Sequence, residues 1–221
     1  MKRLVIIGAG GQGKEVLWAA KRGQLQGAEI AVEGFCDDAP NLQAGTYCNL
    51  PLLGAIEAAA SRLQGKIHYN CAIGNNAVRA KIVQRAERFG WEPLSIVDPL
   101  VLVAPGVVLG EGSYVGAGTI LSPDAILGRH VLVNHDCSIG HDSQLGDFVQ
   151  VCPGGRISGF AVLGEGAFVG SNGVVGPGVT VGAWASLGAN SFAIRAVTAA
   201  TTAVGNPARA VFARNRPKPS L

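Results

Sequence analysis

The chain is poor in aromatic residues, which make up 6% of its 221 residues, and in charged residues, which make up 15%. Its five cysteines are odd in number and contain no CxxC pair, a usage that fits a reducing compartment. No apolar run is long enough to span a bilayer. No signal peptide is expected, because Lys2 and Arg3 lead directly into a short apolar strand. We therefore expect a cytoplasmic protein without a membrane partner.

Acidic residues are absent from the whole sequence after Glu165. The basic residues of this region are Arg195, Arg209, Arg214, Arg216 and Lys218. The net charge of +3 does not by itself argue for nucleic acid, and no nucleic-acid partner is expected. The basic tail is interpreted either as a solvated terminus or as a site for a polyanionic ligand such as phosphates.

Glycine is abundant, with 32 residues, and much of it follows a six-residue period. From Val103 to Leu187 every sixth residue is aliphatic, the residue two positions earlier is small, and the residue after it is usually glycine. A helix would show a period of 3.6 and an ordinary strand a period of 2. A period of six predicts a hexapeptide β-helix, in which three hexads close one coil and the glycine relieves a turn.

The N-terminal region has a different pattern, typical of a Rossmann half-domain. Leu4 to Ile7 predicts a buried strand, 14–22 a helix, and Ile30 to Cys36 a second strand. Between the first strand and the helix lies a GxGxxG, with Gly8, Gly10, Gly11, Gln12 and Gly13. Helices over 55–63 and 76–89 and a strand over 67–73 complete the half-domain. The predicted domains are 1–95 (Rossmann-like), 96–204 (β-helix) and a C-terminal basic tail, 205–221.

The glycine-rich turn permits three interpretations. Glycines at a helix N-terminus allow close approach of a phosphate, and Asp37 and Asp38 follow the second strand where a Rossmann unit places its acidic residue. A full dinucleotide domain has two halves, whereas this chain has one. The pattern therefore favours a nucleotide or nucleotide-sugar pocket over NAD, with a purely structural turn as the remaining reading.

Two histidines of the repeat occupy turn positions and are each followed by aspartate, as His135-Asp136 and His141-Asp142. A carboxylate can hold one imidazole nitrogen and leave the other basic. Because one coil spans three hexads, His141 is expected beneath Gly159, where a missing side chain leaves room for a ligand. A solvated surface pair is the alternative reading.

Several separate motifs resemble one family. They are GAGGQGKEV, FCDD, IGHDSQLGDF, PGGRISG and GNPAR, in that order along nearly the whole chain. In these the chain resembles the bacterial sugar O- and N-acetyltransferases of the left-handed β-helix class, such as sialic acid O-acetyltransferase and the N-acetyltransferases of UDP- or GDP-linked 4-amino-deoxysugars. The resemblance implies an α/β Rossmann-like N-terminal domain and a left-handed parallel β-helix.

The resemblance also implies roles for particular residues. His141 corresponds to the catalytic base and Asp142 to its acidic neighbour, with His135 as the second candidate for the base. The residues implied in acetyl-CoA binding are Gln150, Gly159 and Arg209. The residues implied in substrate binding are Gly8, Gly10, Gly11, Gln12, Gly13, Asp37, Asp38 and Asn134. The implied reaction is acetyl transfer from acetyl-CoA to a nucleotide-linked sugar, N-acetylation being favoured over O-acetylation, in a homotrimer that requires no metal.

Three alternatives remain open. Cys152, in a turn position, could carry an acyl group, whereas Cys137 is expected in the core. A zinc hydrolyase of the gamma carbonic anhydrase type could use His130 and His135, but the third ligand position of that family holds Leu94 here. The chain could also be a non-catalytic scaffold that binds nucleotide sugars.

Overall fold

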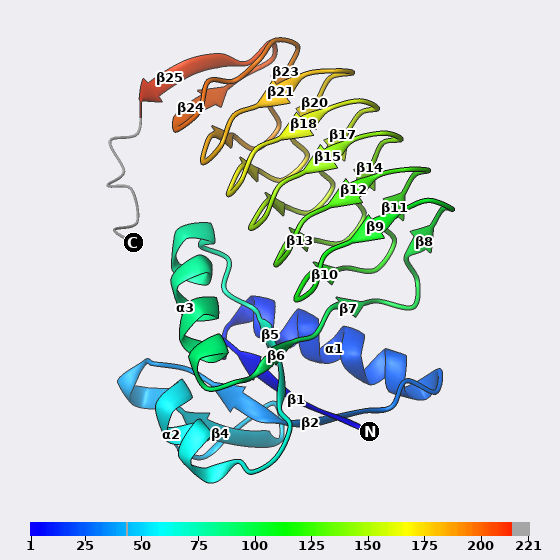
Figure 1. The fold of residues 1–221 in the computed structure, drawn as a ribbon. Helices are drawn as coiled ribbons and strands as arrows, with labels where there is room; N and C mark the ends of the chain where they lie inside the picture. The colour runs from blue at the N-terminus through cyan, green and yellow to red at the C-terminus, as the bar shows by residue number, and fades with distance from the viewer. Residues whose placement is uncertain (43, 214–221) are drawn as a thin grey trace. The chain divides into compact units, whose positions relative to one another are not determined.

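The computed structural model describes residues 1–42 and 44–213. The chain divides into two compact units, Met1–Pro99 and a second unit that begins at Leu100. Figure 1 shows helices and a sheet in the first unit and a stack of short strands in the second. No helix of the described residues is long and apolar enough to cross a membrane.

The first unit is built around one sheet with strand order β3-β4-β2-β1-β5-β6. The strands are β1 (Lys2–Ile7), β2 (Ile30–Cys36), β3 (Thr46–Tyr47), β4 (Leu50–Gly54), β5 (His68–Cys71) and β6 (Glu92–Pro93), followed by β7 (Ile96–Val97). The helices are α1 (Gly11–Leu25), α2 (Ile56–Arg62) and α3 (Asn76–Arg88), with a short 3₁₀ turn, η1 (Pro40–Leu42). Pairing is parallel except between β3 and β4, as expected of strands joined by helices.

Strand β4 was not predicted from the sequence. Its five residues contain Pro51 and end at Gly54, so they lack the alternation that signals a strand. It forms because Leu52 is buried and pairs with Phe35 in β2. The sheet therefore places four parallel strands, β4, β2, β1 and β5, side by side, and the residues that follow β1 and β2 meet at one edge.

The second unit is a left-handed β-helix whose strands, two residues long up to β23, form three sheets with parallel pairing, to one of which the longer strands β24 and β25 are added. We name each sheet by one of its strands. The β14 sheet holds β8 (Leu102–Val103), β11 (Ile120–Leu121), β14 (Ser138–Ile139), β17 (Arg156–Ile157), β20 (Val174–Val175) and β23 (Phe192–Ala193). The β15 sheet holds β9 (Val108–Leu109), β12 (Ile126–Leu127), β15 (Gln144–Leu145), β18 (Val162–Leu163) and β21 (Thr180–Val181). The β16 sheet holds β10 (Tyr114–Val115), β13 (Leu132–Val133), β16 (Gln150–Val151), β19 (Phe168–Val169), β22 (Ser186–Leu187), β24 (Thr201–Val204) and β25 (Arg209–Ala213).

The aliphatic residues of the period point into the prism, as predicted, and from Val115 to Leu187 each is at most 2% exposed. Val103 and Leu109 are less buried because they belong to the first coil, and Val103 is 56% exposed. The polar residues at the small inward positions are hydrogen-bonded to the backbone. Thr119, for example, donates to the Asn134 carbonyl (2.7 Å) and accepts from the Cys137 amide (3.1 Å). Burying the Thr119 hydroxyl therefore costs little free energy of folding, because its hydrogen bonds are satisfied.

The reason expected for the repeated glycines was wrong. Gly116 and Gly140 do not adopt a positive φ; they are glycine because the next coil lies too close for a Cβ, which would meet the His135 amide nitrogen at 2.8 Å and the Gly159 nitrogen at 2.5 Å. The left-handed backbone occurs two positions further on. Residues with φ between +54° and +60° there include Asp124, Asp136 and Asp142, a conformation that aspartate tolerates.

The β-helix continues beyond the last strict hexad and ends in a hairpin. Strand β24 pairs with β22 in parallel and with β25 in antiparallel fashion. The hairpin covers the backbone edge that the last coil would otherwise expose. Of the basic tail, Arg214, Arg216 and Lys218 lie outside the described residues.

Candidate functional site

His141 and Asp142 form an outward-facing pair at the corner between the β14 and β15 sheets, which we call the His141 corner. The imidazole Nδ1 lies 2.8 Å from Asp142 Oδ2, and the His141 side chain is 56% exposed. The left-handed backbone of Asp142, with φ of +57°, turns its carboxylate back toward the preceding ring. The pair is thus fixed locally and faces solvent, which a general base needs in order to reach a substrate.

The imidazole ring lies against Gly159, one coil further along. A Cβ at Gly159 would meet His141 Nε2 at 2.7 Å, and the Phe160 ring contacts the imidazole edge-on, with ring centroids 5.0 Å apart. The prediction placed His141 beneath Gly159, and this is confirmed. The space at Gly159 is occupied by the ring itself, however, and not by room for a ligand. Gly159 and Phe160 therefore orient the imidazole with Nε2 directed away from Asp142.

The three histidines of the β-helix lie at three different corners. His130 follows β12 at the corner between the β15 and β16 sheets, is 1% exposed and stacks on Phe148, with centroids 5.4 Å apart. His135 follows β13 at the third corner, and its ring makes no hydrogen bond within the described chain. The carboxylate of Asp142 therefore distinguishes His141 from His135.

Three residues of the second unit implied in acetyl-CoA or substrate binding lie away from the His141 corner. Asn134 precedes His135 at the third corner and is 7% exposed. Gln150 lies on β16, with a buried Oε1 that has no hydrogen-bond partner and an Nε2 that lies 3.7 Å from Cys152 Sγ. Arg209 begins β25 and is exposed, with Nη1 donating to the Ala208 carbonyl at 3.1 Å. One copy of the β-helix does not bring Asn134 and Gln150 to His141.

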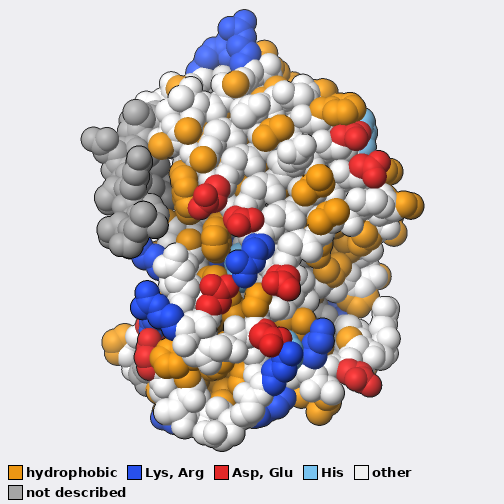
Figure 2. All heavy atoms as spheres, in the orientation of Figure 1, with side chains coloured by type: hydrophobic (Ala, Val, Ile, Leu, Met, Phe, Trp, Pro, Cys, Tyr) orange, Lys and Arg blue, Asp and Glu red, His pale blue; other side chains and the backbone are white. Residues whose placement is uncertain are grey.

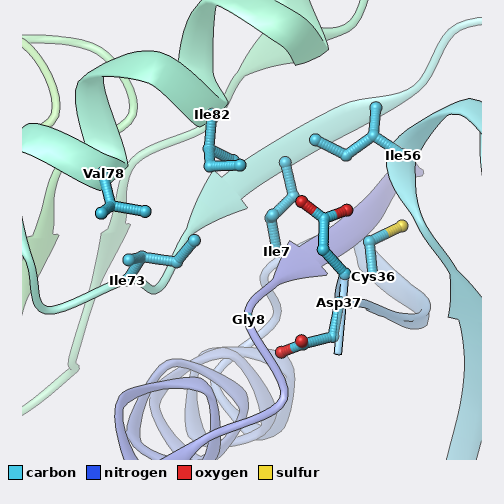
Figure 3. A pocket seen from close by; sticks show the side chains of 9 residues that line it. Ile7, Gly8, Cys36, Asp37, Ile56, Ile73, Val78 and Ile82 are labelled. Atoms are coloured by element: carbon cyan, nitrogen blue, oxygen red, sulfur yellow. The ribbon is translucent and has the colours of Figure 1, made fainter. Parts of the chain in front are cut away.

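The first unit contains a separate pocket at the edge of its sheet. It has a volume of ≈ 200 Å³ and is lined by Ile7, Gly8, Cys36, Asp37, Asp38, Ile56, Ile73, Val78 and Ile82. Figure 3 shows apolar side chains from β1, α2, α3 and the loop after β5 around this space, with Gly8 and Asp37 beside it. The predicted substrate residues Gly8, Asp37 and Asp38 are thus brought together.

The glycines of the GxGxxG have two kinds of role. Gly13 is packed so closely on the Gly8 carbonyl that no Cβ fits, and Gly8 has φ of +110°, so both are required by the fold. A Cβ at Gly10 or Gly11 would meet nothing within 4 Å. Gly10 caps α1 without a side-chain hydrogen bond, and no acidic residue lies in the first turn. The N-terminus of α1 therefore keeps amides that can bind an anion, and Gln12 beside them has a buried Nε2 without a partner.

Arg85 and Glu57 belong to this region but were not predicted. Arg85 of α3 binds Asp38 with N–O distances of 2.5 and 3.2 Å and Glu57 of α2 with distances of 2.8 to 3.1 Å. Hydrogen bonds from Arg85 lower the pKa of the Glu57 carboxyl. An arginine between two carboxylates in different elements has no sequence signature, because its partners lie 28 and 47 residues away.

The cysteines do not favour covalent catalysis. Burial raises the pKa of Cys137 to about 11, and burial also raises that of Cys152. Cys137 donates to the Cys152 carbonyl at 3.2 Å from an inward position, as expected of a core residue. Both are therefore thiols near neutral pH, and the thiol is a weak nucleophile. The five cysteines are free.

Comparison with known proteins agrees with both units. A family model described as the PglD N-terminal domain matches residues 3–86. PerB from Caulobacter crescentus, solved with CoA and GDP-perosamine, is 30% identical with a TM-score of 0.88, over 96% of this chain and 98% of that chain. The chain belongs to the left-handed β-helix sugar acetyltransferases.

Two further solved structures from this family are similar over nearly their full length. The acetyltransferase domain of PglB from Neisseria gonorrhoeae FA1090, in complex with acetyl coenzyme A, is 29% identical with a TM-score of 0.86, over 95% of this chain and 99% of that chain. WeeI from Acinetobacter baumannii AYE is 26% identical with a TM-score of 0.87, over 96% and 100%. No curated protein sequence matches the chain.

The positions of the three histidines argue against the zinc hydrolyase alternative. A left-handed β-helix can hold zinc when three histidines converge, but His130, His135 and His141 diverge from three corners of one prism. Within residues 1–42 and 44–213 no group of three or more His, Cys, Asp or Glu side chains is arranged to hold a metal ion. The zinc alternative therefore has no ligand set in the described part of this acetyltransferase chain.

Proposed function

We propose that this chain transfers an acetyl group from acetyl-CoA to an amine of a nucleotide-linked sugar, with His141 as general base. The observation that carries the proposal is the outward His141–Asp142 pair with Nε2 directed over Gly159. The pocket in the first unit supplies a separate place for the nucleotide. The similarity to PerB, whose structure contains CoA and GDP-perosamine, and to PglB with acetyl coenzyme A supports this assignment.

In the proposed mechanism Asp142 accepts a hydrogen bond from Nδ1–H, which leaves Nε2 with a lone pair. The sugar amine attacks the thioester carbonyl carbon, a C–N bond forms, and Nε2 takes the proton that the amine loses. The tetrahedral intermediate then collapses, the C–S bond breaks, and the proton passes to the CoA sulfur. The Gly159 amide makes no hydrogen bond within the described chain, so it can donate to the oxyanion; such a donor contributes about 2.7–4 kcal/mol.

Acetyl transfer is tested by incubating the protein with acetyl-CoA and a panel of UDP- and GDP-linked 4-amino sugars. We expect release of the CoA thiol that depends on the sugar, and a sugar product that gains one acetyl group by mass spectrometry. Matched sugars with a hydroxyl in place of the amine separate N- from O-acetylation. Tight binding of an amino sugar without thioester cleavage would instead identify a non-catalytic scaffold.

The distribution of residues over the corners supports a homotrimer. His141 lies at one corner of the prism while Asn134 and Gln150 lie at and beside another, so a neighbouring copy could complete a site that one copy leaves incomplete. Exposed apolar side chains on the outer faces of the β14 and β15 sheets, at Ile120 (44%) and Ile126 (45%), provide a surface for self-association. Figure 2 shows hydrophobic side chains over the β-helix in this view, with few charged ones between them.

Sedimentation analysis tests the trimer. We expect a species of three times the chain mass of 22.6 kDa. Ile126→Asp is expected to shift this species toward the monomer, because it places a charge in an apolar contact. Leu25→Asp is the matched control, since Leu25 is 88% exposed at the end of α1. A monomeric wild-type protein would exclude a site shared between copies.

A further inference from the structure

Phe160 occupies a backbone position at the His141 corner that disfavours a large side chain. Its φ is +60°, and a bulky residue in this left-handed region is an outlier. The equivalent corner positions of neighbouring coils hold Asp124, Asp142 and Gly178, residue types that tolerate this conformation. Phe160 is nevertheless 60% exposed, so burial does not explain the choice of phenylalanine. A backbone outlier beside a reactive side chain points to a functional role.

Two other aromatic residues of the β-helix share this backbone conformation and have a structural reason for it. Phe148 stacks on His130 with the ring planes 11° apart. The Trp184 ring lies over the glycine eighteen residues earlier, where a Cβ would meet it at 2.3 Å. Both aromatic residues are half-buried. Phe160 instead meets the His141 ring at 90° and stays mostly exposed, so its ring is available to a bound molecule.

Phe160 directly follows the amide that we propose binds the oxyanion. Adjacent Cα atoms are about 3.8 Å apart, and a hydrogen bond from the Gly159 N–H places the acceptor oxygen about 2.9 Å from the nitrogen. The His141 Nε2 borders the same spot, because it would lie 2.7 Å from a Cβ on Gly159. A thioester that is bound to the Gly159 amide within reach of Nε2 therefore lies beside the Phe160 ring.

The carbonyl carbon of this thioester carries three groups, and the corner offers different surroundings to each. The oxygen faces the Gly159 amide, and the amine approaches from the Nε2 side. The sulfur carries the long pantetheine arm, which needs an open path. Gly178 provides such a path, because it lies one coil beyond Phe160 at the same corner and a Cβ there would meet nothing within 4 Å. The acyl chain, on the remaining side, then faces the phenylalanine ring.

We propose that Phe160 determines the length of the acyl group that is transferred, by closing the side of the site toward which a chain longer than acetyl would extend. This inference rests on the proposed function and deepens it on the donor side. The bonds are those of the proposed reaction: a C–N bond forms, the C–S bond breaks, and the amine proton passes through Nε2 to the CoA sulfur. The ring leaves room for a methyl group and obstructs further methylenes.

The Phe160 ring cannot move aside freely. The left-handed backbone fixes the direction of its Cβ, and the ring contacts the imidazole of His141, with centroids 5.0 Å apart. A longer acyl chain must therefore push the ring against the general base or turn the carbonyl carbon away from the amine. Both outcomes reduce the rate of transfer, and one methylene is commonly discriminated by about 10–200-fold.

Steady-state kinetics with acetyl-, propionyl- and butyryl-CoA and one fixed amino sugar test the proposal. For the wild-type protein we expect kcat/KM to fall at least about tenfold from acetyl to butyryl, with propionyl between them. Phe160→Asn should bring the two end values within about threefold of each other, because the shorter side chain opens the blocked side. Asparagine tolerates the left-handed backbone, so this variant should unfold at or above the wild-type temperature.

The ratio between donors separates this role from a purely positioning one. A residue that only oriented His141 would change kcat/KM for all three donors by the same factor. Phe160→Tyr keeps the ring and should keep the wild-type ratio. Phe89→Asn is the matched control for the substitution, since Phe89 is 46% exposed at the end of α3 and outside the β-helix. It should leave both the ratio and the turnover unchanged.

Equal kcat/KM for acetyl- and butyryl-CoA in the wild-type protein, or an unchanged ratio in folded Phe160→Asn, would overturn chain-length selection and leave acetyl transfer intact. If Phe160→Asn does not fold, Phe160→Gly, which suits a positive φ, decides in its place. Absence of thioester cleavage with every donor and every amino sugar would overturn the proposed function and this inference together.

Discussion

His141→Ala is expected to lower kcat for acetyl transfer at least about a hundredfold, the lower end of the contribution of a positioned general base. The ring is exposed and at a corner, so its removal takes no side chain out of the prism. The remaining activity would come from binding and from the Gly159 amide. Because the substitution removes the proton acceptor and not a binding surface, kcat should fall while KM for acetyl-CoA changes little.

His135→Ala is the matched control for this prediction. His135 is also followed by aspartate at a corner of the same prism, but its ring has no carboxylate partner within the described residues. The His135→Ala variant should keep a kcat within about threefold of the wild-type value, because His135 takes no part in the proposed proton transfer. Circular dichroism and thermal unfolding of both variants establish that the fold is intact. Near-native turnover of His141→Ala together with loss of turnover in His135→Ala would move the base to the third corner.

Gly159→Ala is expected to lower turnover by roughly tenfold to a hundredfold with little loss of stability, because misplacing a catalytic group by about 1 Å has effects of this size. The new Cβ would lie 2.7 Å from His141 Nε2. The obstructing atom belongs to an exposed side chain, so the ring can rotate away without disturbing the coil. The ring would then leave the position in which Asp142 and Phe160 hold it. Steady-state kinetics and thermal unfolding of the same preparation measure the two effects separately.

Gly178→Ala provides the comparison one coil further along the same corner. A Cβ there would meet nothing within 4 Å, although its φ of +65° makes the substitution costly for the backbone. We expect the opposite pattern, with a loss of stability of about 1 kcal/mol and nearly unchanged turnover. If Gly159→Ala instead unfolds the protein as readily as Gly178→Ala, or retains full activity, the imidazole is not held by Gly159.

Much of the β-helix and of the His141 corner could be predicted because the relevant residues are related by a short, fixed spacing. A six-residue period identifies the inward face without reference to distant contacts, and the coil places Gly159 on His141. The structural reason for the repeated glycines could not be predicted from the sequence. Close approach of the next coil and a left-handed backbone both favour glycine, so the two causes look the same in the sequence. Coordinates are needed to tell the two reasons apart. Gly140 is glycine because a Cβ there would collide with the Gly159 amide nitrogen, whereas Gly178 adopts a positive φ.

The nucleotide pocket was predicted in part. Gly8, Asp37 and Asp38 follow strands and could be placed at the sheet edge by the Rossmann pattern. Ile56, Ile82 and Arg85 could not, because they come from α2 and α3 and are joined to the pocket only by tertiary packing. Strand β4 was missed for a related reason, since its register is set by Phe35 and not by any alternation of its own.

The uninterrupted stacking of the coils fixes how the length of this protein can vary. Between β8 and β23 each paired strand residue lies eighteen positions from its partner, as Ser138 does from Arg156. Gain or loss of a whole coil would keep every later strand in its own sheet and change only the length of the β-helix. Gain or loss of a single hexad before residue 141 would move every later strand to the next of the three sheets. The imidazole of His141 would then lie at a different corner of the β-helix. Viable length variants should therefore differ in steps of entire coils.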